Sequence, residues 1–172
     1  MGANLRAMYV ASSAQLGASY ALVSVQTFAS NAVTFSGLSG DYRYKIYAKM
    51  AFVDTTETMV EINADTTAAD YTGQTLTGNG ATVSSERLAT NRMVYCDAGD
   101  TYLVLDVDKD STGYVHMIGA YSPMAAGAVA YTSRSVKKAT GVVTEITSIK
   151  LLKSATGTSI TGQALLYRLS KV

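Results

Sequence analysis

The chain has 172 residues, of which 48% are apolar and 16% charged, and 14 Lys and Arg against 13 Asp and Glu leave a net charge of +1. This composition excludes a disordered chain and gives no electrostatic basis for binding nucleic acid or an anionic membrane. A single cysteine and a single histidine exclude an internal disulfide, a cysteine-based zinc site and a histidine-rich metal site. The sequence contains no run of about 18 apolar residues, so we expect no membrane-spanning helix. Residues 1–25 lack the pattern of a signal peptide and are expected to be mature sequence.

Short runs rich in Thr, Val and Tyr, broken by Gly, Ser, Asn and Asp, predict strands throughout the chain. Residues 21–30 and 32–35 are the first candidates, before a turn at 37–41. The clearest run is 42–53, where Tyr42, Tyr44, Ile46, Ala48, Met50 and Phe52 alternate with Arg43, Lys45, Tyr47 and Lys49. A period of two predicts a strand with one face on the core and the other in water.

Six further runs complete the predicted strands: 58–63, 101–107, 114–121, 129–136, 142–153 and 163–169. Polar turns are predicted at 78–80, 97–100, 108–113 and 154–158. The 101–107 run is nearly all apolar, which predicts burial on both faces. About eight strands with short turns predict an all-β fold, a single antiparallel jelly-roll or β-sandwich domain over 17–172. Residues 1–16 are expected to form an N-terminal arm, because residues 12–19 are a weak helix sequence.

Three acidic residues, Asp106, Asp108 and Asp110, alternate before a Ser-Thr-Gly sequence. Carboxylates at this spacing are candidate ligands for calcium, which prefers several converging oxygens. An EF-hand needs Gly at the sixth position of its loop and Glu at the twelfth, where this chain has Ser111 and Met117. The alternative is a strand that runs into a hairpin turn, with Asp and Gly serving the turn geometry. We favour the turn and expect no cofactor.

No residue pattern predicts catalysis. His116 lies in an apolar strand, and no G-x-S-x-G or other nucleophile motif accompanies it, so we favour a structural role. Cys96 is expected to be a small buried hydrophobe. The Gly78-Asn79-Gly80 sequence lacks the Lys of a phosphate loop and predicts a tight turn. The chain is therefore expected not to be an enzyme.

Tyrosine is the one unusual enrichment, with 12 residues. Tyrosine suits protein interfaces and sugar-binding platforms, and it is also a good strand residue. Tyr42, Tyr44, Tyr47 and Tyr71 are the candidate interaction residues, and both interpretations stay open for each of them.

In residues 58–87, a strand ends in Asn63-x-Asp65-Thr66, Tyr71 follows, and Gly78-x-Gly80 leads into a Ser/Thr-rich strand. This stretch resembles a recurring pattern in virion structural proteins of tailed bacteriophages. Residues 145–169 are similar to that family's terminal pair of strands, and residues 25–50 resemble its opening strands. Together the three stretches cover most of the chain in the family's order.

The resemblance implies a jelly-roll virion protein, often assembled as a trimer, on the capsid surface or on a tail appendage, with no catalytic residues. We therefore expect a non-enzymatic capsid decoration or cement protein that is located in the virion. Its expected partners are the major capsid protein and further copies of itself, and the 1–16 arm would reach onto the shell or a neighbouring subunit. The alternative is a tail or neck appendage for host adsorption, which would bind a host surface glycan through exposed tyrosine around 66–80. Neither nucleic acid nor a membrane is an expected partner.

Overall fold

The computed structural model describes residues 20–28, 30–54, 56–79, 82–96, 98–123, 130–138, 140–154 and 159–170. These residues form two antiparallel sheets that pack face to face. The large sheet has the order β1 (Ala21–Thr27), β12 (Thr161–Ser170), β3 (Tyr42–Phe52), β8 (Gly99–Lys109), β9 (Val115–Pro123), β10 (Ala130–Lys138), β5 (Tyr71–Asn79) and β6 (Thr82–Leu88). The small sheet has the order β2 (Ala32–Ser36), β11 (Ser148–Lys153), β4 (Thr56–Ile62) and β7 (Arg92–Cys96). A short 3-10 helix, η1 (Ala68–Asp70), precedes β5.

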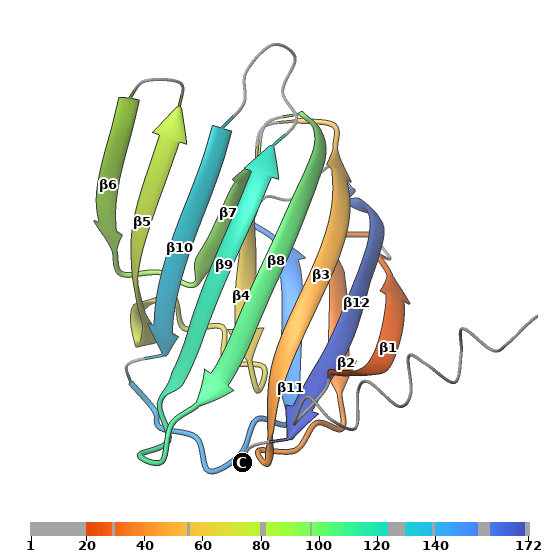
Figure 1. The fold of residues 1–172 in the computed structure, drawn as a ribbon, viewed down its shortest axis with the longest axis vertical. Helices are drawn as coiled ribbons and strands as arrows, with labels where there is room; N and C mark the ends of the chain where they lie inside the picture. Colours follow the sequence, from red (N-terminus) through yellow and green to blue (C-terminus); the bar gives the residue numbers. More distant parts are fainter. Residues whose placement is uncertain are drawn as a thin grey trace, which may run out of the picture.

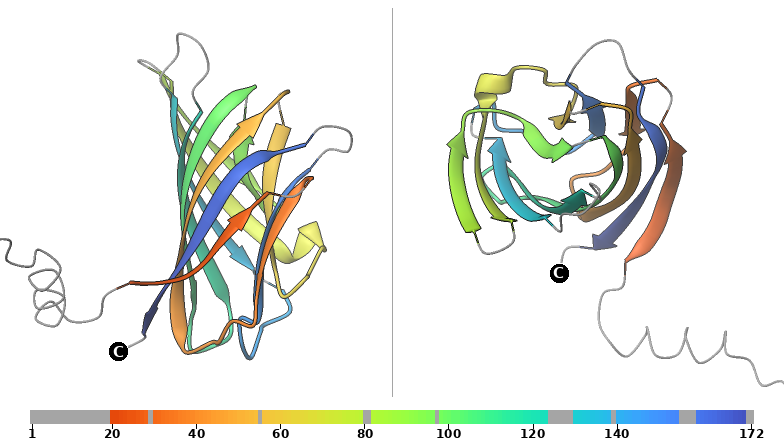
Figure 2. Two further views of the ribbon diagram at one scale, coloured as in Figure 1. Left: turned by 90° about the vertical axis from the view of Figure 1, so that its right-hand side faces the viewer. Right: turned by 90° about the horizontal axis from the view of Figure 1, so that it is seen from above.

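The predicted all-β sandwich is confirmed. Figure 1 shows the large sheet in front and the small sheet behind it. Seen from above, the large sheet curves around the small one, with β1 and β6 at its two ends (Figure 2, right). None of the helices in the described ranges has the length and apolar character that a membrane crossing requires.

The alternation predicted for 42–53 is present in β3. Ile46, Ala48 and Met50 are buried against the small sheet, whereas Tyr47 and Lys49 are exposed on the opposite side. The sheets approach closely at Gly119 of β9, because a Cβ atom there would lie 2.8 Å from the Met93 Sδ of β7. The core between the sheets is filled mainly by aliphatic and Met side chains, among them Ile46, Met50, Leu105, Met117, Leu166, Val60, Ile62, Ile149 and Leu151.

The prediction that 101–107 is buried on both faces is wrong. Thr101, Leu103 and Leu105 are buried, but Tyr102 is 46% exposed and Val104 is half-buried. The physical reason is that the small sheet covers only one side of the large sheet, so the second side of β8 lies at the surface. We call this second side the outer face of the large sheet.

Several predicted boundaries differ from the structure. The predicted strand 142–153 is a strand only over β11, and residues 142–147 form an irregular segment. That segment is held by the Asn63 side chain, which accepts a hydrogen bond from the Thr147 N–H at 2.7 Å and donates one to the Glu145 carbonyl at 2.7 Å. The structure also has strands at 71–79, 82–88 and 92–96, where the residue pattern alone predicted none. Of these three, the strand at 82–88 corresponds to the Ser/Thr-rich strand that the resemblance implied.

Several predictions lie partly or wholly outside the described residues. They are the 1–16 arm, most of the 154–158 turn, Gly80 of the predicted 78–80 turn, and the side chain of Cys96. Gly78 and Asn79 themselves belong to β5.

Candidate interaction surface

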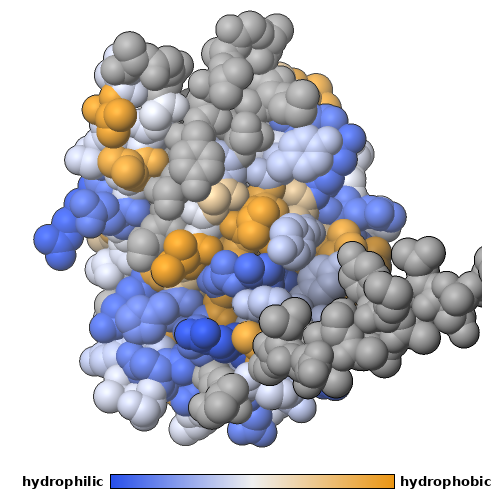
Figure 3. Space-filling view, viewed as in Figure 1, coloured by the Kyte–Doolittle hydropathy of each residue, from blue (hydrophilic) through white to orange (hydrophobic). Residues whose placement is uncertain are grey.

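The outer face of the large sheet carries a continuous row of apolar side chains. Val25, Leu165, Tyr47, Val104 and Ala120 lie side by side across β1, β12, β3, β8 and β9 in cross-strand register. We call these five residues the apolar row. Val25 is 50% and Tyr47 43% exposed, so the row is accessible to a partner. Figure 3 shows hydrophobic groups gathered in the middle of this face.

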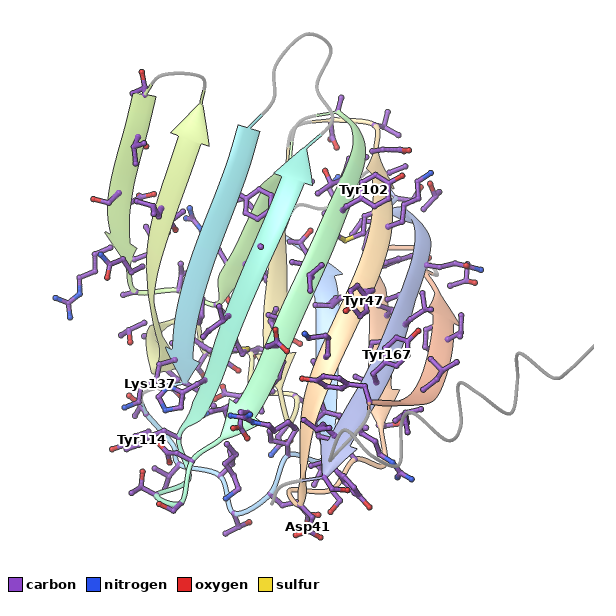
Figure 4. The ribbon with its side chains drawn as sticks, in the orientation of Figure 1. Asp41, Tyr47, Tyr102, Tyr114, Lys137 and Tyr167 are labelled. Atoms are coloured by element: carbon purple, nitrogen blue, oxygen red, sulfur yellow. The ribbon has the colours of Figure 1, made fainter. Side chains whose placement is uncertain are left out.

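Aromatic side chains border the apolar row. The Tyr47 and Tyr167 rings meet edge to face with centroids 5.7 Å apart. Tyr102 flanks the row on the side of Lys49, whose Nζ lies 5.8 Å from the Tyr102 ring centroid. Figure 4 shows Tyr47, Tyr102 and Tyr167 on this face of the sheet. These rings offer rigid contact area at low entropic cost, and they end in hydroxyl groups that suit the edge of an interface.

Ion pairs between β3 and β8 lie on both sides of the apolar row. Arg43 Nε lies 2.8 Å from Asp108 Oδ2, and Lys45 Nζ lies 3.3 Å from Asp106 Oδ1. On the other side Lys49 pairs with Asp100 at 3.0 Å, and its hydrogen bond to that carboxylate raises the pKa of Lys49. Exposed ion pairs contribute little to stability. They balance the charge of the face and give the apolar row a polar rim.

The arrangement of Asp106, Asp108 and Asp110 gives no support to the calcium interpretation. Asp106 and Asp108 each face a cation of β3, and Asp110 lies in the β8–β9 turn. Its Oδ1 accepts hydrogen bonds from the Thr112 N–H at 2.9 Å and the Thr112 hydroxyl at 2.7 Å. Within the described ranges, no three or more His, Cys, Asp or Glu side chains are grouped as a metal ion requires. Each of the three carboxylates is paired with a different side chain, Asp106 with Lys45, Asp108 with Arg43 and Asp110 with His116.

The alternative, a hairpin turn, is what the structure contains. The Asp110 N–H donates to the Tyr114 carbonyl at 3.0 Å, and the Gly113 N–H donates to the Asp110 carbonyl at 3.2 Å. His116 Nε2 lies 3.0 Å from Asp110 Oδ2 and links β9 to the turn. The hydrogen bonds from Thr112 and His116 hold the pKa of Asp110 well below its usual range. His116 therefore has the structural contact that the sequence favoured.

A groove of about 460 Å³ opens on the outer face where β3, β8 and β9 approach this turn. Its polar lining includes Tyr20, Arg43, Asp106, Asp108, Asp110 and His116, with Ile118 as an apolar wall. Tyr20, the first described residue, covers one side: its ring centroid lies 5.0 Å from Lys45 Nζ and its hydroxyl 3.4 Å from Asp106 Oδ1. The groove offers hydrogen-bond donors and acceptors beside an aromatic ring.

Two of the four tyrosines named as candidate interaction residues are in the core. Tyr44 is 2% exposed, and its hydroxyl donates to the Ser39 carbonyl at 2.7 Å and accepts from the Ser39 N–H at 2.8 Å. Tyr71 is fully buried, and its hydroxyl accepts from the Ile62 N–H at 3.1 Å and donates to the Asp65 carbonyl at 3.2 Å. Burial raises the pKa of Tyr71 to about 12. The two hydroxyl groups hydrogen-bond the backbone of the loops at Ser39 and Asp65 and hold these loops against the core. The interpretation of Tyr44 and Tyr71 as surface interaction residues is therefore wrong.

The other two tyrosines are accessible. Tyr47 is part of the apolar row, and the partly exposed Tyr42 ring lies 4.7 Å from the Arg168 guanidinium carbon. The sequence analysis missed Tyr102, Leu165 and Val25 as surface residues. Their signal was the period of two: each faces the same side as Tyr47 once the strands are placed in register.

Searches of protein-family models, curated proteins and solved structures found no match to this chain.

Proposed function

We propose that the chain is a non-enzymatic structural protein of a tailed-bacteriophage virion, and that it acts as a capsid decoration or cement protein. The observation that supports a contact function is the exposed apolar row on the outer face of the large sheet. Extended apolar patches with a polar rim are typical of protein interaction sites. The assignment to a phage particle is based on the sequence resemblance in residues 25–50, 58–87 and 145–169.

In this proposal the major capsid protein packs against the outer face. Tyr47 and Val104 would fill hollows in the shell at the centre of the contact, where aromatic and apolar anchors contribute most. The ion pairs of Arg43 and Lys49 would lie at the rim, where they remain hydrated and set the orientation. Burial of side chains that are now about half exposed supplies the driving force.

We propose that the N-terminal residues add to this contact. Tyr20, the first described residue, lies against Lys45 and Asp106 on the outer face. Residues 1–16 are therefore attached to the chain beside the surface that we assign to the shell. Deleting them is expected to abolish attachment to virions while the domain still folds; normal attachment would contradict a role for the arm.

The variant Val104→Lys tests the outer face. It places a charge in the middle of the apolar row, and we expect binding to capsids that lack the protein to weaken at least tenfold, because an unpaired cation would be buried in the contact. Val53→Lys is the matched control, since Val53 is 73% exposed and lies beyond the end of β3, outside the row. Far-UV circular dichroism and a melting curve establish that both variants fold. Equal binding by Val104→Lys and the parent protein would contradict the proposed surface.

The number of copies per virion separates the decoration role from the alternative. Quantitative mass spectrometry of purified particles, scaled to the major capsid protein, is expected to give hundreds of copies for a decoration protein. A count in the low tens would favour a tail or neck appendage. Absence of the protein from virions would contradict the virion assignment altogether.

The groove beside Tyr20 favours a second candidate function, host adsorption through a surface glycan. The Tyr20 ring can stack on a sugar. The polar groups of Arg43, Asp106 and His116 can form hydrogen bonds with the hydroxyls of that sugar. We therefore propose the groove as the glycan contact in place of residues 66–80, because Tyr71 is buried. A glycan array with the parent protein and the His116→Ala variant tests the idea, with Tyr102→Ala as the control outside the groove. Binding that is absent, or unchanged in His116→Ala, would contradict it.

A further inference from the structure

We propose that β6 pairs with the β6 strand of a second copy of this chain, so that two large sheets join edge to edge. β6 is the last strand of the large sheet, and in the described residues it is hydrogen-bonded only to β5. Residues Thr82 to Arg87 are all exposed, so β6 offers accessible side chains on both faces as well as an open backbone edge. Figure 1 shows β6 at the margin of the sheet. The inference goes beyond the proposed function and does not depend on it.

An open edge of this kind needs a partner or a protective device. Natural proteins protect edge strands with Pro, with charged side chains and especially Lys, or with bulges that interrupt the regular backbone. The charged residues of β6 are Glu86 and Arg87, near the end of the strand, and Thr82 to Ser85 are uncharged. β6 has the sequence Thr-Val-Ser-Ser-Glu-Arg-Leu, and its pairing with β5 is regular from Thr82 to Leu88. The opposite edge strand, β1, has a register irregularity between Leu22 and Ser24. β6 is therefore the regular edge, and β1 the interrupted one.

Strand overlap and charge together favour one register for the pairing of β6 with itself. Residues directly opposite each other in an antiparallel pair have side chains on the same face of the sheet. A two-fold axis perpendicular to the sheet also keeps each residue and its copy on the same face. The axis must therefore pass beside a residue that lies opposite its own copy. An axis at Ser85 aligns the whole strand and places Val83 opposite Arg87 of the second copy, and Ser84 opposite Glu86. An axis at Glu86 or Arg87 would place like charges directly opposite each other, which is destabilising. The structure therefore favours the axis at Ser85.

Two exposed apolar side chains of the β5–β6 hairpin lie on the same face of the sheet as Ser85. Leu76 of β5 is 54% exposed and Val83 68% exposed, and both face outward on the hairpin. Leu76 is directly opposite Ser85, so the two copies of Leu76 would flank the two-fold axis. A single strand of seven residues buries less than the roughly 1,200 Å² of a standard interface. We expect a weak contact in dilute solution that becomes populated where copies are held close together.

Disulfide trapping tests the register. In a Cys96→Ala background, Ser85→Cys places two thiols directly opposite each other, where Cβ atoms about 4.5–5.5 Å apart can reach disulfide geometry with small adjustments. Thr82→Cys is the matched control, at another exposed position on the same strand. In the proposed register Thr82 lies opposite Leu88, which leaves its own counterpart about 20 Å away at a rise of ~3.4 Å per residue. Mild oxidation is expected to give at least tenfold more covalent dimer for Ser85→Cys than for Thr82→Cys.

Equal trapping of the two variants, or no trapping of Ser85→Cys, would overturn the proposal. Circular dichroism and melting curves of the reduced variants establish that they fold. Sedimentation equilibrium of the parent protein gives an independent result: a concentration-dependent dimer supports the pairing. A trimer without Ser85→Cys trapping overturns it, because a cyclic trimer joins two different surfaces. Capsid binding by Val104→Lys is measured separately, so failure of the β6 pairing and failure of the proposed function are distinguishable.

Discussion

The variant Tyr71→Phe removes one oxygen atom from the interior and leaves the ring in place. The Tyr71 hydroxyl is the acceptor for the Ile62 N–H and the donor to the Asp65 carbonyl, so it connects the end of β4 to the loop that follows. Ile62 and Tyr71 are both fully buried, so water cannot replace the lost acceptor without a rearrangement. The Asp65 carbonyl belongs to an exposed segment and can turn to solvent.

The expected cost follows from these two bonds. An ordinary hydrogen bond contributes about 1 kcal/mol, and a buried N–H left without an acceptor costs about 1–3 kcal/mol. We therefore expect Tyr71→Phe to lower the free energy of unfolding by about 2 kcal/mol. In a domain of this length each kcal/mol shifts Tm by about 2–4 °C, which gives a Tm lowered by about 4–8 °C.

Thermal unfolding followed by circular dichroism measures the change, with Tyr47→Phe as the control. Tyr47 is 43% exposed on the outer face, so loss of its hydroxyl is expected to change stability by less than about 0.5 kcal/mol. A Tm for Tyr71→Phe within about 1 °C of the parent value would refute the reasoning that the buried hydroxyl holds this loop.

The same residue predicts how stability depends on alkaline pH. Burial raises the pKa of Tyr71 to about 12 in the folded chain, against 10.0 for an ordinary tyrosine. Above pH 10 the unfolded chain therefore releases a proton that the folded chain retains, and stability falls as the pH rises towards 12, by up to about 1.4 kcal/mol per pH unit. Urea unfolding at pH 9 and pH 11 is expected to show a smaller loss for Tyr71→Phe than for the parent. An identical loss in both proteins would contradict the assignment of this effect to Tyr71.

The remaining predictions concern the start of β12, the end of β10 and the β8–β9 turn. Gly162→Ala is expected to prevent folding or cost more than about 3 kcal/mol, because Gly162 has φ +125° and a Cβ atom there would overlap the Lys49 carbonyl; soluble yield and Tm measure this. Lys138→Met is expected to cost about 3 kcal/mol, because the buried Lys138 Nζ lies 2.7 Å from Asp65 Oδ2. The hydrogen bond from Lys138 lowers the pKa of Asp65, so this stability is present above about pH 4 and is lost as the pH falls; an unchanged acid unfolding curve in the variant would contradict it. Asp110→Ala is expected to lower Tm by loosening the turn, whereas calcium or a chelator is expected to leave the Tm of the parent protein unchanged.

The sequence predicted β3 well, because both faces of that strand are encoded. Over 42–52, mostly apolar residues on one face alternate with a face that carries three cations. A helix would distribute these cations around its circumference, so the pattern indicates a strand. The same alternation could have excluded Tyr44 from the surface, since Tyr44 has the parity of Ile46. It could also have assigned Asp106 and Asp108 correctly. Both lie on the same face of β8 as Tyr102, at even-numbered positions. Asp106 and Asp108 pair with Lys45 and Arg43 of the neighbouring strand β3.

Other features depend on distant parts of the chain and have no local pattern. The position of Tyr71 in the core becomes evident only when η1 and the end of β4 are placed around it. The irregular path of 142–147 depends on Asn63, which is 84 residues away from Thr147 in the sequence. Such contacts come from the tertiary fold, which propensity and periodicity do not encode.

One of the three strands that the residue pattern did not identify, β6, is also the strand where the large sheet leaves the core. β6 has no alternation, because neither of its faces is buried, and Thr82 to Arg87 are exposed throughout. A strand without a core face gains little from the hydrophobic effect, and a hairpin of two strands is marginally stable alone. β5 is supported by β10 on its other side, but β6 has β5 alone in the described residues. The missing periodicity and the open edge therefore have one physical cause, and a second copy paired along β6 would supply the stabilisation that the core does not.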